Sequence, residues 1–373
     1  MAHSTYKVDK FARATIKFAA LGLILVVLFA AFIIYAIRAR SAQGNEGASG
    51  TEVVTADWYS VYFTDPGSPN SLSYRGGPEE HLAAAIDQAR MSVDVAIYDL
   101  DLWRLRDALL SANQRGVDVR VVCDGDNIDK PEIQTLLEAE ISVRGDRGYG
   151  LMHNKFVIID RREVWTGSMN FTRTGVYLNN NNLIRIRSSK LAQNYLVEFE
   201  EMFVDGLFGA GSPSNTPDPT LLCEGTLIEV YFSPDDYTEA QIIRLIGEAE
   251  SSIFFLAFSF TSSAIAEAMI ERAQSGVTVS GVFERTQYRS NIGSEYMTFI
   301  YHGLDVRLDG NPRNMHHKVI IIDERVVITG SYNFSSSAGL RNDENTIIIH
   351  NEDIAGLYLG EFDRVFVNGD FQP

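Results

Sequence analysis

Periodic apolar positions divide most of the chain into short strands and amphipathic helices. Residues 79–90 and 102–116 carry apolar side chains at helical spacing. Residues 93–100, 117–123 and 155–160 are apolar runs of strand length, rich in β-branched side chains. This alternation predicts a sheet covered by helices, with mostly parallel or mixed strands.

A longer apolar stretch near the N-terminus does not fit that pattern. Residues 18–37 contain no charged side chain, and this is about the length that a helix needs to cross a bilayer. More basic residues precede the stretch than follow it, which favours a cytoplasmic N-terminus. We expect a cytoplasmic tail at 1–17, a single-pass anchor in the cell membrane at 18–37, and the rest of the chain outside the cytoplasm. A cleaved signal peptide is the alternative.

The remaining chain repeats itself. Residues 152–203 and 315–366 share 23 identities in 52 ungapped pairs, an offset of 163 positions that indicates an internal duplication. Gly, Pro, Ser and Asn crowd residues 209–220, and residues 41–50 have the composition of a flexible spacer. The predicted boundaries are therefore a linker at 38–56, a first half at 57–208, a second linker at 209–224 and a second half at 225–373.

Charge limits the classes of partner. Beyond residue 50 the chain has 26 basic and 47 acidic residues, a formal net charge of about −21. Nucleic-acid affinity rests largely on neutralisation of phosphates by Lys and Arg, so this charge disfavours nucleic acid, although a local basic pocket could override it. Two cysteines are too few for a disulfide scaffold, and Cys123 ends an apolar run, which favours a buried thiol.

The repeated segment contains a constellation of polar residues. The first copy reads MHNKFVIIDRREVWTGSMNF from Met152, and the second reads MHHKVIIIDERVVITGSYNF from Met315. If residues 164–170 form the next strand and a hairpin turns about Arg161 and Arg162, then His153 pairs with Asn170 and Lys155 with Ser168. The same register pairs His316 with Asn333 and Lys318 with Ser331. Each copy would then gather His, Lys, Ser and Asn on one face, with Asp160 or Asp323 pointing away.

Such a face suits an anionic phosphate. Lys supplies a positive charge, Asn and Ser supply hydrogen-bond donors, and His supplies a titratable nitrogen. Two copies that meet would provide two histidines, one to attack phosphorus and one to protonate the leaving oxygen. The sequence has no HExxH motif and no Cys/His set with ligand spacing, so we expect neither a metal nor another cofactor.

The pattern H-x-K-x4-D-x6-G-S-x-N, present twice, resembles the phospholipase D superfamily. The resemblance covers essentially all of residues 57–373. It implies two α/β/α halves related by a pseudo-two-fold axis, with both motifs at the interface, and phosphodiester cleavage through a phosphohistidine. It also implies a catalytic set, with Ser168 and Ser331 in support and Asp160, Asp323, Gly167 and Gly330 as structural motif residues. Carried onto this chain, that set is His153, Lys155, Asn170, His316, Lys318 and Asn333.

Members of the family also have a downstream acidic residue that orients each histidine. Glu344 fits this role in the second copy, whereas Asn181 occupies the matching position of the first. A carboxylate favours imidazolium. We therefore expect Glu344 to pair with His316 as the general acid, and His153 to be the neutral nucleophile. Stabilisation of a phosphohistidine cation by the carboxylate would reverse the two roles.

Other residues near the motifs have less specific interpretations. His317 alternates away from the predicted pocket, and we expect a packed or surface histidine. Arg144, Arg147, Arg307 and Arg313 precede the motifs. They could be solvated loop charges, but we expect them to form a basic rim around the pocket.

Three activities are compatible with these observations. Hydrolysis of phospholipid head groups by a membrane-anchored enzyme is the favoured one, with the phospholipid membrane and a phosphodiester substrate as partners. A nuclease is the second, which the net charge disfavours. A phosphatidyltransferase resembling cardiolipin synthases is the third, although such enzymes usually have more membrane-spanning sequence. With both motifs in one chain, a monomer should suffice.

Overall fold

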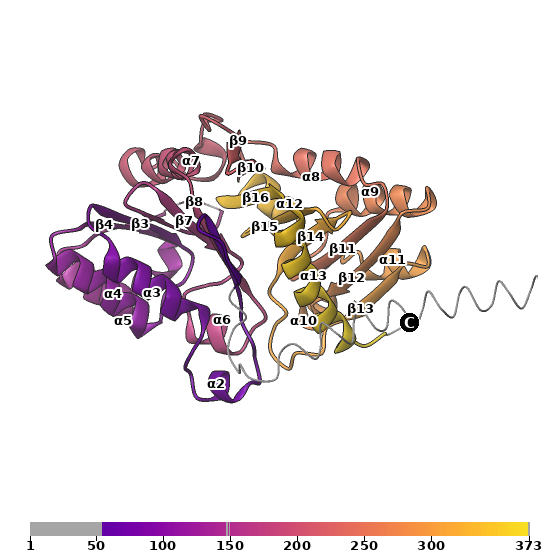
Figure 1. Ribbon diagram of the computed structural model, residues 1–373, viewed down its shortest axis with the longest axis horizontal. Coiled ribbons are helices and arrows are strands. Elements are labelled where there is room, and N and C mark those ends of the chain that lie inside the picture. Colours follow the sequence, from indigo (N-terminus) through magenta and orange to yellow (C-terminus); the bar gives the residue numbers. More distant parts are fainter. Residues whose placement is uncertain (1–53, 147, 149, 372–373) are drawn as a thin grey trace, which may run out of the picture. The chain divides into compact units, whose positions relative to one another are not determined.

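The computed structural model describes residues 54–146, 148 and 150–371, which fold around two eight-stranded sheets (Figure 1). The strands of the first sheet are β1 Val54–Thr55, β2 Tyr59–Phe63, β3 Ser92–Ile97, β4 Asp118–Cys123, β5 Ser142–Gly145, β6 Lys155–Ile159, β7 Glu163–Gly167 and β8 Asn182–Arg187. Those of the second are β9 Thr220–Cys223, β10 Thr226–Ser233, β11 Ser252–Ala257, β12 Thr278–Phe283, β13 Asp305–Leu308, β14 Lys318–Ile322, β15 Val326–Gly330 and β16 Glu344–His350.

The two sheets have the same strand order. The first runs β1-β2-β8-β7-β6-β3-β4-β5, and the second, read from its other end, runs β9-β10-β16-β15-β14-β11-β12-β13. In each sheet the last three strands are parallel and the others are antiparallel. The expectation of a duplicated, mixed α/β fold is confirmed.

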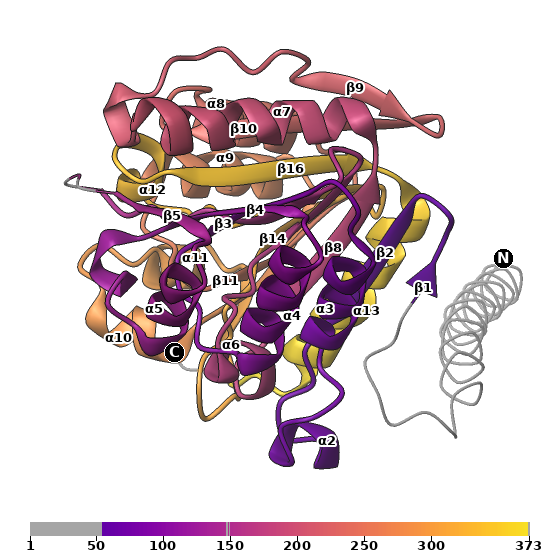
Figure 2. The same ribbon diagram turned by 90° about the vertical axis from the view of Figure 1, so that its left-hand side faces the viewer.

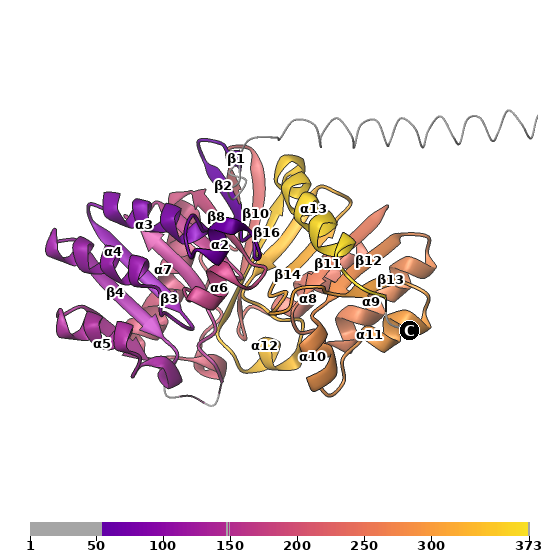
Figure 3. The ribbon, with the colours of Figure 1, turned by 90° about the horizontal axis from the view of Figure 1, so that it is seen from below.

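Helices cover both faces of each sheet (Figures 1 and 3). Helices α3, α4 and α5 pack with the first sheet in one apolar core, and α8, α9 and α11 pack with the second sheet in another. A third core contains the facing sides of both sheets together with α7 and α13, so these two helices lie between the halves. The helices are α2 Pro69–Leu72, α3 Pro78–Gln88, α4 Trp103–Gln114, α5 Pro131–Glu138, α6 Arg173–Tyr177, α7 Ser189–Glu200, α8 Thr238–Gly247, α9 Ser263–Gln274, α10 Arg285–Ser290, α11 Tyr296–Tyr301, α12 Ser336–Leu340 and α13 Glu352–Val367.

The predicted hairpin register is wrong by one residue. Phe156 pairs with Thr166, so the paired positions sum to 322, and the second copy shows the same displacement. The turn is centred on Asp160 and Arg161, which both adopt positive φ (52° and 57°), and Arg162 N donates to Ile159 O. The strand also ends at Gly167, before the Ser and Asn of the motif.

Two further expectations can be compared with the described residues. The linker predicted at 209–224 contains strand β9, which pairs with β10 and extends the second sheet (Figure 2). The predicted anchor at 18–37, its flanking tail and most of the first linker lie outside the described residues. Within residues 54–371, as far as they are described, no helix is long and apolar enough to cross a membrane.

Candidate active site

The two halves exchange backbone hydrogen bonds at the motif histidines. His153 N donates to Asp343 O (2.9 Å), and Asp343 N donates to Leu151 O (2.9 Å). His316 N donates to Asn180 O (2.9 Å) in the mirrored contact. Each histidine is therefore held by a loop of the opposite half, the one before β16 for His153 and the one before β8 for His316. Both histidines lie at the interface between the halves.

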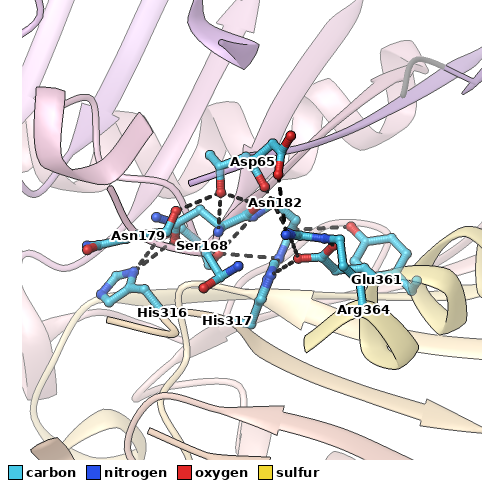
Figure 4. Close-up of polar contacts among 12 residues, drawn as sticks. Asp65, Ser168, Asn179, Asn182, His316, His317, Glu361 and Arg364 are labelled. Atoms are coloured by element: carbon cyan, nitrogen blue, oxygen red, sulfur yellow. Dashed lines mark hydrogen bonds and ion pairs between the residues drawn. The ribbon is translucent and has the colours of Figure 1, made fainter. Parts of the chain in front are cut away.

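This exchange decides which side chain orients which histidine. His153 Nδ1 lies 2.7 Å from Glu344 Oε2, whereas His316 Nδ1 lies 2.9 Å from Asn181 Oδ1 (Figure 4 shows the side of His316). The expected pairing of Glu344 with His316 is therefore wrong. Spacing along the chain pairs each histidine with a residue of its own copy. In the structure the orienting loop crosses the interface, so its side chain contacts the histidine of the other copy.

Both lysines are buried beneath the histidines. Lys155 Nζ donates to His153 O (2.7 Å), and Lys318 Nζ donates to His316 O (2.8 Å). An ammonium group has three N–H groups, so each lysine can also donate to a bound anion. Burial lowers the pKa of Lys155 to about 7 and that of Lys318 well below its usual value. The negative charge of Glu344 opposes both shifts of the lysine pKa.

Burial favours the neutral form of both histidines. Burial lowers the pKa of His153 to about 4, with Glu344 acting in the opposite direction and Lys155 adding to the shift. Burial also lowers the pKa of His316 well below its usual value, and both lysines and His153 contribute. An anionic phosphate in the pocket would oppose these effects, because a nearby negative charge favours the protonated forms.

The motif asparagines present polar atoms without partners. The Oδ1 atoms of Asn170 and Asn333 are buried, and neither accepts a hydrogen bond. A buried polar atom without a partner is costly, so both amides are candidates for contact with a bound ligand. The serines lie one layer further back: Ser168 Oγ accepts from Asn182 N, and Ser331 Oγ accepts from Asn345 N.

Two aromatic rings complete the walls, and the sequence reasoning missed them. The ring centroid of Tyr98 lies 5.1 Å from that of His153, and Phe258 lies 4.4 Å from His316 in the same way. The rings also lie 5.4 Å from Lys155 Nζ and 4.5 Å from Lys318 Nζ. Tyr98 and Phe258 each follow the matching strands β3 and β11 directly, so alignment of the two repeats could have identified them.

The structure also places the motif residues that the sequence analysis expected to be structural. Asp160 accepts hydrogen bonds from the backbone N–H groups of residues 90, 91 and 92, and Asp323 does the same for residues 250, 251 and 252. Both carboxylates therefore fix the hairpin turn to the start of a parallel strand. Gly167 has φ +149°, and a Cβ atom there would lie 2.3 Å from Asn182 O; Gly330 has the same relation to Asn345 O.

Two of the four arginines expected to form a basic rim make other contacts, and for the other two the rim stays a prediction. Arg144 donates to Val204 O, while Arg307 stacks on Phe366 (3.8 Å from its guanidinium carbon to the ring centroid). Both side chains therefore hold the ends of the inter-sheet helices instead of facing the pocket. Arg313 is exposed, and Arg147 lies outside the described residues.

Two buried side chains agree with the sequence analysis. His317 is fully buried, and its Nε2 lies 2.8 Å from Glu361 Oε1 (Figure 4). It is thus a partnered histidine of the interior, beside the site and not on the surface. Cys123 is a buried free thiol, as predicted.

Comparisons with known proteins agree with this geometry. Residues 82–203 and 242–366 match the family model described as "Cardiolipin synthase, PLD-like domain". A phospholipase D of Rickettsia prowazekii is 36% identical over 132 residues, which is 35% of this chain and 64% of that protein. The human mitochondrial cardiolipin hydrolase is 34% identical over 139 residues, or 37% of this chain and 55% of that protein.

The chain thus spans less than two thirds of the length of these relatives. A solved structure of phosphatidylserine synthase from Haemophilus influenzae has a similar fold, with a TM-score of 0.62 and 13% identity, and the match covers 89% of this chain and 90% of the other. The duplicated motif, the two matching sheets and the two regions matched by the family model lead to one conclusion. The chain belongs to the phospholipase D superfamily.

Proposed function

We propose that the protein is a phosphodiesterase of the phospholipase D type. The observation that carries this proposal is the meeting of two His-Lys pairs at one interface, where a loop of each half orients the histidine of the other half. The lysines and asparagines bind the non-bridging phosphate oxygens. One histidine attacks phosphorus and the other protonates the departing oxygen, the division of work that covalent phosphoryl transfer requires.

We assign the attack to His153. Its Nδ1–H donates to Glu344, so the Nε2 lone pair is directed at the substrate. Formation of the Nε2–P bond puts a positive charge on the ring, which the Glu344 carboxylate stabilises. The sequence analysis left open that the histidine with a carboxylate partner is the nucleophile, because the carboxylate stabilises the phosphohistidine cation. The histidine with that partner is His153.

His316 then acts as the general acid. In the substrate complex its Nε2–H passes a proton to the alcohol oxygen as the P–O bond breaks. In the second half-reaction the neutral Nε2 accepts a proton from water, the water oxygen bonds to phosphorus, and the N–P bond to His153 breaks. The amide of Asn181 does not stabilise imidazolium as a carboxylate would, so His316 gives up its proton readily.

The substrate class that we propose is a phospholipid, cleaved at the head group. The acidic charge disfavours polyanions, and relatives are named phospholipase D and cardiolipin hydrolase. Leu151, two residues before His153, and Leu340, the last residue of α12 and four residues before Glu344, are exposed (37% and 68%). Apolar side chains beside the site favour contact with a lipid surface, and an anchor at 18–37 would hold the protein at such a membrane.

The test compares the full chain on short-chain phosphatidylcholine and on single-stranded DNA, with His153→Ala as the control. Release of choline by the wild-type chain, lost in the variant, is the expected result. Cleavage of DNA without release of choline would replace the lipid substrate with nucleic acid. Absence of both activities would contradict the phosphodiesterase assignment.

A further inference from the structure

A chain of hydrogen bonds connects His316 to a second histidine behind the site (Figure 4). It begins with His316 and ends at an ion pair between two α13 residues, of which Glu361 is buried and Arg364 is partly exposed. Each link is a direct side-chain contact of 3.3 Å or less. In order, the members are His316, Asn181, Ser168, Asn182, His317, Glu361 and Arg364.

The ion pair fixes the tautomer of His317. Arg364 donates to both carboxylate oxygens of Glu361 (2.8 and 2.7 Å), so this carboxylate is an acceptor for the His317 Nε2–H (2.8 Å). Burial keeps the pKa of His317 below its usual value, so the ring is neutral and has one proton. His317 Nδ1 is therefore an acceptor.

This acceptor fixes the amide of Asn182. Nδ2 of Asn182 lies 3.1 Å from His317 Nδ1 and donates to it, and its other N–H donates to Ser168 Oγ (3.3 Å). The amide oxygen accepts from the hydroxyls of Thr329 and Tyr358 (3.1 and 3.2 Å). With this orientation every polar atom of the amide has a partner.

The orientation is passed on to His316. Ser168 Oγ already accepts from the backbone N and from Nδ2 of Asn182, so its own proton is donated to Asn181 Oδ1 (2.8 Å). Asn181 Nδ2 donates to Gly175 O, which leaves Oδ1 to accept from His316 Nδ1 (2.9 Å). The backbone carbonyl of Ser168 also lies 3.1 Å from His316 Nδ1 and can only accept, so it favours the same tautomer. The proton of neutral His316 is thereby held on Nδ1, and Nε2 faces the pocket.

The opposite half provides an internal comparison. Asn154 occupies the position that matches His317, and Asn345 matches Asn182. Asn345 is turned the other way: its Nδ2 donates to Thr166 and Tyr195, and its Oδ1 accepts from Lys155 N. His153 is oriented by the carboxylate of Glu344. A carboxylate can only accept, so its orientation needs no further chain of hydrogen bonds.

We propose that His317 is a positioning residue for His316, acting through Asn182 and Ser168 to hold the Asn181 amide with its oxygen toward the general acid. An amide can present either a donor or an acceptor, so Asn181, unlike a carboxylate, depends on its neighbours to turn its oxygen toward His316. Gly175 O and this chain favour the same orientation. The effect on proton donation by His316 rests on the proposed function, whereas the effect on which His316 nitrogen carries the proton does not.

The test uses His317→Asn, which copies the residue of the first half, in the full chain. Two esters with the same short-chain phosphatidyl group are compared, one releasing choline and the other releasing p-nitrophenol. Choline is a poor leaving group that needs the general acid, and p-nitrophenolate departs without it. We expect kcat for choline release to fall about tenfold, a part of the ~10²–10⁴-fold that a general acid contributes, while p-nitrophenol release stays within about twofold.

Retained p-nitrophenol release also shows that the variant is folded. Glu361→Gln should give the same selective loss, and Glu198→Gln, its match in the first half, should not. Equal losses on both esters would show a merely structural role and overturn the proposal.

A second readout is the ¹⁵N spectrum of histidine-labelled protein. We expect the protonated nitrogen of His316 to be Nδ1 in the wild-type chain and the Nδ1 signal to be shifted in His317→Asn. An unchanged His316 signal in His317→Asn would contradict the proposal, whether or not the esters are hydrolysed. A wild-type chain that hydrolyses neither ester would overturn only the proposed function.

Discussion

His153 and Glu344 are 191 residues apart in the chain, yet His153 Nδ1 lies 2.7 Å from Glu344 Oε2. The matching contact on the other side of the pocket joins His316 to the neutral amide of Asn181. The duplicated halves therefore present two histidines with different partners. Under the proposed mechanism, this difference gives the site a direction, with the nucleophile on one side and the proton donor on the other.

Restoring a carboxylate beside His316 should change its titration. In Asn181→Asp the new carboxylate favours imidazolium, so the pKa of His316 rises from its depressed value. The general acid then keeps its proton to higher pH, and the alkaline limb of the kcat profile should shift upward by about one pH unit. The pH dependence of choline release measures this; Asn181→Ser should not shift the limb upward. A limb that does not move in Asn181→Asp would contradict the assignment of His316 as the acid.

Removal of the charge at Glu344 should affect every substrate. Glu344→Gln leaves a group of the same size but weakens stabilisation of the phosphohistidine cation, so kcat should fall roughly 10–10²-fold. Because the step affected is attack on phosphorus, the choline and p-nitrophenol esters should lose activity alike. His316→Ala should instead lose choline release preferentially. A selective loss in Glu344→Gln would indicate that His153 is the acid.

Buried carboxyl groups near α7 should make stability depend on pH. Burial raises the pKa of Glu201 to about 7 and that of Asp343 to about 8. A group with a raised pKa binds a proton on folding, and the stability it contributes at low pH is lost as the pH rises through that pKa. Glu201→Gln should therefore raise the free energy of unfolding by about 2 kcal/mol more at pH 8.5 than at pH 5.

Urea denaturation at the two pH values measures this difference, and Arg364→Gln is the matched control in the second half. Arg364 neutralises Glu361, so its removal leaves a buried carboxylate without a cation and should destabilise the protein at pH 8.5. Equal effects of Glu201→Gln at both pH values would show that this carboxyl group titrates normally.

The proposed mechanism uses only side chains of this protein, which predicts that chelators do not change the rate. Two lysines neutralise the phosphate, and two histidines move the protons. Choline release should be the same with and without EDTA after dialysis, with a metal-dependent phosphodiesterase as the positive control. Loss of activity that a divalent cation restores would require a different account.

The duplication explains how much of the fold could be predicted. An offset of 163 residues fixed the equivalence of the halves, and apolar runs such as 117–123 matched strands closely. The hairpin register could not be predicted, because it depends on Asp160 and Arg161 both adopting positive φ, which is unusual for residues other than glycine. A shift of one residue is invisible in the hydrophobic pattern of a strand buried on both faces.

The site was predicted as a set of residues, and its connections were not. His153 and Lys155 follow from the motif, but the partner of each histidine depends on loops that cross between the halves. The role proposed for His317 depends on Asn182 and Glu361, which are 135 and 44 residues away. Contacts of this kind are set by tertiary packing, so spacing along the chain does not reveal them.

The most direct test of the account identifies the histidine that carries the substrate. The full chain is mixed with short-chain phosphatidylcholine, quenched within a turnover, digested with trypsin at neutral pH and analysed by mass spectrometry. Lys155 and Lys318 end the peptides that contain His153 and His316, so the two sites are separable. The account predicts a phosphatidyl adduct on His153. An adduct on His316 would contradict the direction of attack, and the absence of any adduct in an active enzyme would contradict the covalent mechanism.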